Sequence, residues 1–91
     1  MQAIGAFPNS TEPRLVDADE PDQPGSEEVL CRTVRLGVCG TDRDILESAK
    51  PMVPEGEPYL VLGHECLARV ESTGRQVSGL SVGDYVVPAV R

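Results

Sequence analysis

The sequence predicts a mainly β domain, a small barrel or sandwich with one short helix. Apolar residues occur in short runs, and nine glycines and eight prolines separate these runs along the chain. Only one segment, near residues 42–48, carries the signals of a helix. Short strands separated by Gly/Pro turns are typical of small barrels and sandwiches. The 91 residues suffice for a single domain, residues 1–91.

The N-terminal part of the chain predicts two strands and a long loop. Gln2–Phe7 is an apolar run that ends at Pro8, and Arg14–Asp17 is a second, shorter strand. The acidic stretch Asp17–Glu28 contains two prolines and a glycine. Because such a composition supports neither a helix nor a buried strand, we expect a surface loop here.

The middle of the chain predicts a longer strand, a bend and the helix. The strand covers Glu28–Leu36, although Arg32 and Arg35 fall on opposite faces in a regular alternation. Two glycines then break the strand. Thr41 or Asp42 is the expected N-cap of a helix of about two turns, Asp42–Ser48.

The remaining chain predicts a loop over 51–58 and three further strands. Tyr59–Leu62 and Tyr85–Val87 are short apolar runs beside turn residues. Between them lies an alternating strand whose inward face is expected to consist of Cys66, Ala68 and Val70.

Composition excludes several classes of function. The net charge of −7 argues against nucleic-acid binding, which requires a basic patch. No apolar run approaches the roughly 20 residues that span a membrane, and no signal peptide is apparent. Three cysteines without a Cys-x-x-Cys pair indicate reduced thiols and a cytoplasmic protein.

The first candidate for chemistry is Cys39, which lies between two glycines just before the predicted helix. The positive end of a helix favours a thiolate, which is a good zinc ligand. The hydroxyl of Thr41, two residues later, is placed to pass a proton. The alternative is a small buried cysteine packed at a strand–helix corner.

The second candidate is His64 with Glu65, a pair of zinc-type ligands that follows a glycine. A lone histidine is more often an ordinary surface or core residue. Together, however, Cys39 and His64 can meet at one end of a barrel, where two or three ligands and an open position make a catalytic zinc site. Asp42 is expected to fix the tautomer of His64. Cys66 is a rival ligand, because a strand would place it on the same face as His64.

Three motifs occur in one order: Gly37-Val-Cys-Gly-Thr-Asp42, Gly63-His-Glu65 and Gly79-x-x-x-Gly83-Asp84-x-Val86. With these motifs, and with the run Val86–Arg91, nearly the whole chain resembles the N-terminal part of the zinc-dependent medium-chain alcohol dehydrogenases. Within this family the sequence is most similar to glucose 1-dehydrogenases, followed by threonine and sorbitol dehydrogenases. The resemblance implies a GroES-like, partly open β-barrel.

The resemblance also implies roles for single residues. Cys39 and His64 would bind zinc, and Glu65 would be a ligand or a nearby carboxylate that exchanges with water. Thr41 would relay the proton of the substrate hydroxyl, and Asp42 would orient His64. Zinc would act as a Lewis acid while hydride leaves to NAD or NADP.

Two features depart from the family pattern. Ala68 stands where the family usually has glycine, and Cys66 beside the Gly-His-Glu run is unusual. The 91 residues also contain no Gly-x-Gly-x-x-Gly turn, so the nucleotide-binding Rossmann domain is absent from this chain.

These observations leave three hypotheses. The first is an N-terminal piece of a zinc- and NAD(P)-dependent dehydrogenase of a sugar or polyol, inactive and weak in zinc binding by itself. Its partners would be the alcohol or sugar substrate and the C-terminal Rossmann domain, in a homo-oligomeric parent enzyme. The second is a free-standing GroES-like binding or assembly module without catalysis. The third is self-association of the isolated chain through surface that the rest of the enzyme would cover.

Overall fold

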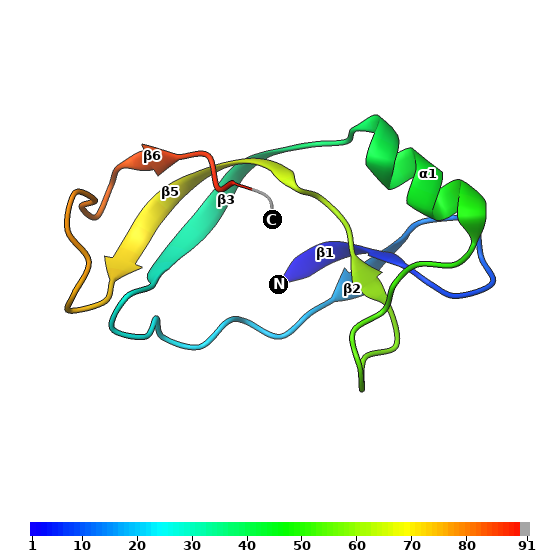
Figure 1. Cartoon of the computed structure of the whole chain (residues 1–91), viewed down its shortest axis with the longest axis horizontal. Coiled ribbons are helices and arrows are strands. Elements are labelled where there is room, and N and C mark those ends of the chain that lie inside the picture. Colours follow the sequence, from blue (N-terminus) through cyan, green and yellow to red (C-terminus); the bar gives the residue numbers. More distant parts are fainter. Residues whose placement is uncertain (90–91) are drawn as a thin grey trace. The chain divides into compact units, whose positions relative to one another are not determined.

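The computed structural model describes residues 1–89, and its strands and helix fall into two compact units (Figure 1). Unit 1 combines Met1–Asp19 with Val38–Gly63, and unit 2 combines Glu20–Gly37 with His64–Arg91. Each unit contains one three-stranded antiparallel sheet. The last two residues of the run Val86–Arg91 lie outside the described part of the chain.

The sheet of unit 1 has the strand order β2-β1-β4. Its strands are β1 (Gln2–Ala6), β2 (Arg14–Asp17) and β4 (Leu60–Val61). Gly5 in β1 leaves room for two aromatic rings, because a Cβ there would lie 3.2 Å from Tyr59 and 3.3 Å from Phe7. The two rings pack with their centroids 5.3 Å apart, and the Arg14 guanidinium lies 4.2 Å above the Phe7 ring.

The helix α1 of unit 1 spans Gly40–Ser48. It begins two residues earlier than the sequence predicts, and its N-cap is Cys39, so the expectation of Thr41 or Asp42 as N-cap is wrong. The physical reason is that Asp42 occupies the third helical position, from which its carboxylate reaches back to the cap. At the other end Ala49 adopts a left-handed conformation, with φ 54°, and terminates the helix.

The sheet of unit 2 has the order β3-β5-β6. It consists of two nine-residue strands, β3 (Val29–Gly37) and β5 (Glu65–Thr73), and the short edge strand β6 (Tyr85–Val86) (Figure 1). Ala68 and Val70 of β5 are 3% and 2% exposed and form its core, as their alternation predicts. Cys66, expected beside them, is only half-buried.

Two irregularities interrupt the pairing of β3 with β5. One lies between Thr33 and Arg35, and it changes which face the following residues occupy. Arg32 pairs with Arg69 and Arg35 pairs with Leu67, two residues away on β5. Arg35 therefore lies on the same face as Arg32, whereas a regular alternation predicts opposite faces.

Within residues 1–89 six strands and one helix confirm a mainly β fold. Neither sheet of this described part closes on itself, because each retains two edge strands. In the same residues no helix combines the length and the apolar content that crossing a bilayer requires.

Candidate metal centre

Cys39 is held at the start of α1 by a hydrogen bond from its backbone N–H to the side chain of Asp42. Its N–H donates to Oδ2 of Asp42 over 3.1 Å, and the Asp42 side chain is only 2% exposed. The cysteine itself is extended, with φ −109° and ψ 178°. Asp42 therefore fixes the direction in which the chain enters the helix, and with it the position of the Cys39 side chain.

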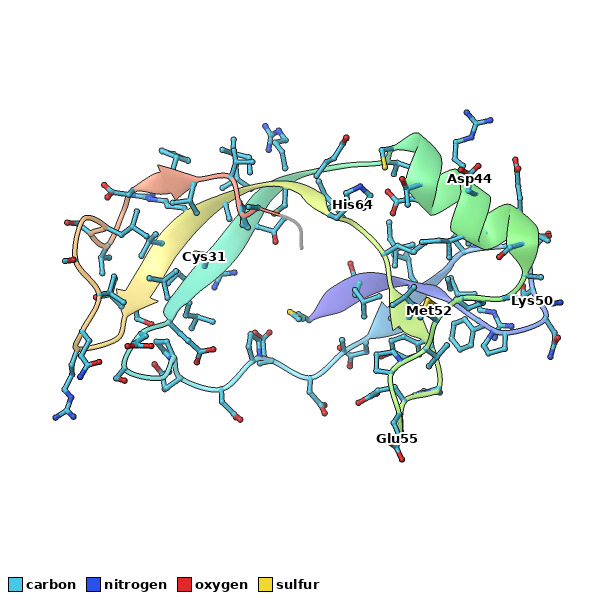
Figure 2. The ribbon with its side chains drawn as sticks, in the orientation of Figure 1. Cys31, Asp44, Lys50, Met52, Glu55 and His64 are labelled. Atoms are coloured by element: carbon cyan, nitrogen blue, oxygen red, sulfur yellow. The ribbon has the colours of Figure 1, made fainter. Side chains whose placement is uncertain are left out.

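His64 and Glu65 mark the point where the chain enters β5. Gly63 before them has φ 109°, a left-handed conformation that favours glycine. Glu65 is the first residue of β5 and pairs with Gly37, the last residue of β3. Figure 2 labels the imidazole of His64 just before this strand begins.

Chain connectivity brings Cys39 to the same place. Cys39 follows Gly37 by two residues, and two residues of extended chain span at most about 7 Å. Because Gly37 is the strand partner of Glu65, Cys39 and the pair His64-Glu65 are neighbours. One ligand atom from each of Cys39, His64 and Glu65 can be chosen so that the three lie within 4.8 Å of one another.

These three donors suit zinc. A thiolate sulfur, an imidazole nitrogen and a carboxylate oxygen are its usual protein ligands, and three of them leave a fourth position open. Zinc–ligand bonds of about 2.0–2.3 Å in a tetrahedron separate the ligand atoms by roughly 3.5 Å. The three ligand atoms lie up to 4.8 Å apart, so zinc would have to draw them together by roughly 1 Å to reach that geometry.

The other predicted site residues lie around this group in different ways. Thr41 is exposed in the first turn of α1, two residues after Cys39. Cys66, the rival ligand, is not a member of the group found among residues 1–89. Its Sγ lies 3.7 Å from Oγ1 of Thr33 across the β3–β5 pair. One reason is that β5 begins at Glu65, so His64 precedes the strand whose alternation suggested a shared face.

The role of Asp42 as the partner of the Cys39 backbone was not predicted. Its signal is in the sequence, because a carboxylate three residues after an N-cap is the spacing of a capping box. Cysteine is an uncommon N-cap, which hides the pattern.

Residues 25–90 match the family model of the alcohol dehydrogenase GroES-like domain. The chain belongs to this family. The resemblance that the three motifs predict is thereby confirmed, and so is the fold class. The family match includes all three residues of the metal group.

Relatives of this chain include several enzymes named glucose 1-dehydrogenase. The chain is 46% identical to glucose 1-dehydrogenase 1 of Caldivirga maquilingensis over 92 aligned residues, which cover 100% of the chain and 26% of the relative. It is also 46% identical to the glucose 1-dehydrogenase of Thermoproteus tenax, with the same coverage. The chain thus spans about a quarter of the length of the curated relatives it matches.

Solved structures agree with this assignment. A structure described as Haloferax mediterranei glucose dehydrogenase in complex with NADP, Zn and gluconolactone is 39% identical and matches with a TM-score of 0.83. The match covers 99% of this chain and 24% of that one. Alcohol dehydrogenase TADH from Thermus sp. ATN1 is 28% identical, with a TM-score of 0.76, and the match covers 93% of this chain and 23% of that one.

Proposed function

We propose that this GroES-like domain supplies the catalytic zinc site of a glucose 1-dehydrogenase-like enzyme that oxidises a sugar or polyol hydroxyl with NAD or NADP. The observation that carries the proposal is that one ligand atom from each of Cys39, His64 and Glu65 lies within 4.8 Å of the others. A similar enzyme supports the same chemistry, since the Haloferax mediterranei glucose dehydrogenase was solved in complex with NADP, Zn and gluconolactone.

Each residue of the site has a distinct role in this proposal. Cys39 and His64 hold the metal, and Glu65 serves as a third ligand or as a carboxylate that exchanges with water. A zinc ion at this position would supply Lewis acidity, which lowers the pKa of a bound hydroxyl. The exposed hydroxyl of Thr41 accepts and passes on the substrate proton.

Asp42 acts on the site through its neighbours. Its carboxylate accepts the hydrogen bond from the Cys39 backbone, which holds the ligand-bearing residue in place. We further infer that Asp42 orients the imidazole of His64, as a carboxylate commonly does for a metal-bound histidine.

The nicotinamide belongs to another part of the protein in this proposal. The 91 residues contain no Gly-x-Gly-x-x-Gly turn, and the curated relatives have about four times the length of this chain. We infer that the domain of residues 1–91 works together with a Rossmann domain, and that the whole enzyme is a homo-oligomer.

The test is a comparison of two cysteine variants of the intact protein. Cys39→Ser should abolish bound zinc and lower activity on glucose at least 1,000-fold, because the metal that stabilises the transition state is lost. A 1,000-fold loss of rate corresponds to about 4 kcal/mol of transition-state stabilisation. Cys66→Ser is the matched control and should retain both. Metal content is measured by elemental analysis, and activity with glucose, sorbitol and threonine and with both nucleotides.

Three outcomes would contradict the proposal. Unchanged zinc content in Cys39→Ser would show that Cys39 is not a ligand. Loss of zinc in Cys66→Ser alone would show that Cys66 is the ligand instead. A protein without zinc and without activity on any of these substrates would instead favour a binding or assembly module.

A further inference from the structure

Gly37, the last residue of β3, faces the side chain of Glu65 across the ladder. A Cβ on Gly37 would lie 3.1 Å from Oε2 and 3.3 Å from Cβ of Glu65, and 3.6 Å from its carbonyl oxygen. The first two distances are shorter than ordinary van der Waals contact between such atoms. The Glu65 carboxylate therefore occupies space that any side chain at position 37 would take.

The backbone does not explain why position 37 is glycine. The glycines with a left-handed conformation are residues 56, 63, 79 and 83, and Gly37 is not among them. An extended conformation at a strand end is open to any residue. What distinguishes Gly37 is the group that occupies the place of its absent side chain. This group is the carboxylate of Glu65, a candidate metal ligand.

Gly40, on the other side of Cys39, provides a contrast. A Cβ on Gly40 would meet no atom within 4 Å. The two glycines that flank Cys39 are thus alike in sequence but not in surroundings. Only Gly37 restricts a residue of the metal group.

We propose that Gly37 is a positioning residue, whose absent side chain sets the place of the Glu65 carboxylate in the metal group. This inference rests on the proposed function. Zinc–ligand bond lengths in proteins stay within about 0.2 Å of their usual values, and a Cβ at position 37 would push Oε2 of Glu65 away by a few tenths of an ångström. Replacing a residue that orients a metal ligand typically lowers metal affinity by about 10–100-fold.

The experiment compares zinc affinity in variants of the intact protein, measured by competition with a chromophoric chelator. Gly37→Ala should weaken zinc binding about tenfold, whereas the matched control Gly40→Ala should bind zinc like the unsubstituted protein. Cobalt substituted for zinc should show shifted visible absorption bands in Gly37→Ala only, because the ligand field at the metal changes.

A double-mutant cycle shows whether Gly37 acts through Glu65. Glu65→Ala removes the carboxylate that the new Cβ would meet, and in this background Gly37→Ala should cause no further loss of affinity. Equal losses in both backgrounds, or unchanged affinity and spectrum in Gly37→Ala, would overturn the inference. Absence of zinc from the unsubstituted protein would overturn the proposed function as well, so the two failures are distinguishable.

A second variant decides the case in which Gly37→Ala does not fold. Adding Glu65→Gly removes both the carboxylate and the Cβ that the new Cβ would meet. Recovery of the folded circular dichroism spectrum in the double variant would support the contact between residues 37 and 65. Failure to recover would contradict it.

Discussion

The two ends of the β3–β5 ladder both depend on a glycine, but the groups that crowd the two glycines differ. At one end Gly37 lies against the side chain of Glu65. At the other end Gly74 follows β5, and a Cβ on it would overlap with the carbonyl oxygens of Gly25 and Ser26. A carboxylate at the end of a flexible side chain can move, whereas a backbone carbonyl cannot move without the chain segment that carries it.

The end of the sheet at Gly37 therefore carries a candidate metal ligand, whereas the end at Gly74 is a site of backbone packing. The N–H of Gly74 donates to the carbonyl of Glu28 over 2.8 Å, and the N–H of Gln76 donates to the carbonyl of Ser26 over the same distance. These bonds fasten the loop that precedes β3 to the turn that follows β5. Crowding at Gly74 should therefore change stability, whereas crowding at Gly37 should change metal binding.

The largest effect on stability is expected for Gly74→Ala. The added methyl overlaps with two backbone carbonyls, and overpacking of this kind costs about 3 kcal/mol of unfolding free energy. Denaturant unfolding followed by circular dichroism measures the loss. Gly79→Ala is a useful comparison, because a Cβ there meets nothing within 4 Å but its φ of 84° is strained for alanine.

Weaker zinc binding per folded molecule in Gly74→Ala would contradict this difference between Gly37 and Gly74. Unfolding of Gly74→Ala at the same denaturant concentration as the unsubstituted protein would also contradict it. A large loss of stability with unchanged zinc affinity would support it, since Gly37→Ala is expected to lose zinc affinity rather than stability.

A smaller effect on stability is expected for Asp42→Ala, which removes the carboxylate that holds Cys39. Loss of the bond to the Cys39 N–H should destabilise the protein by about 1 kcal/mol, as other helix caps do. Zinc binding should weaken about tenfold, because Cys39 is less firmly placed. Asp44→Ala is the matched control, since Asp44 is an exposed carboxylate of the same helix, labelled on α1 in Figure 2.

Isothermal titration with zinc and denaturant unfolding are measured on both aspartate variants. Equal behaviour of Asp42→Ala and Asp44→Ala in the two measurements would mean that the capping bond has no part in holding the site.

Much of this molecule is predictable from local patterns. The mainly β fold, the short helix and the inward positions of Ala68 and Val70 follow from turn residues and alternation, which depend on neighbours in sequence. The three metal-group residues follow from their chemistry, from the glycines beside them and from the family motifs that contain them.

What escapes prediction depends on contacts between distant segments. Arg32 and Arg35 share a face only because an irregularity in the pairing shifts the register, and no local pattern marks that place. The crowding of Gly37 depends on Glu65, which is far away in sequence. Cys39 is missed as the N-cap because Thr41 and Asp42 are more common capping residues. The three-residue spacing from Cys39 to Asp42 is nevertheless a local signal of a capping box.

The most direct test of the account is the thiolate-to-cobalt charge-transfer band near the ultraviolet in the cobalt-substituted intact protein. We expect the band in the unsubstituted protein and in Cys66→Ser, and its loss in Cys39→Ser, because Cys39 supplies the sulfur of the metal group. A band that survives in Cys39→Ser would contradict the account, as would one that disappears in Cys66→Ser.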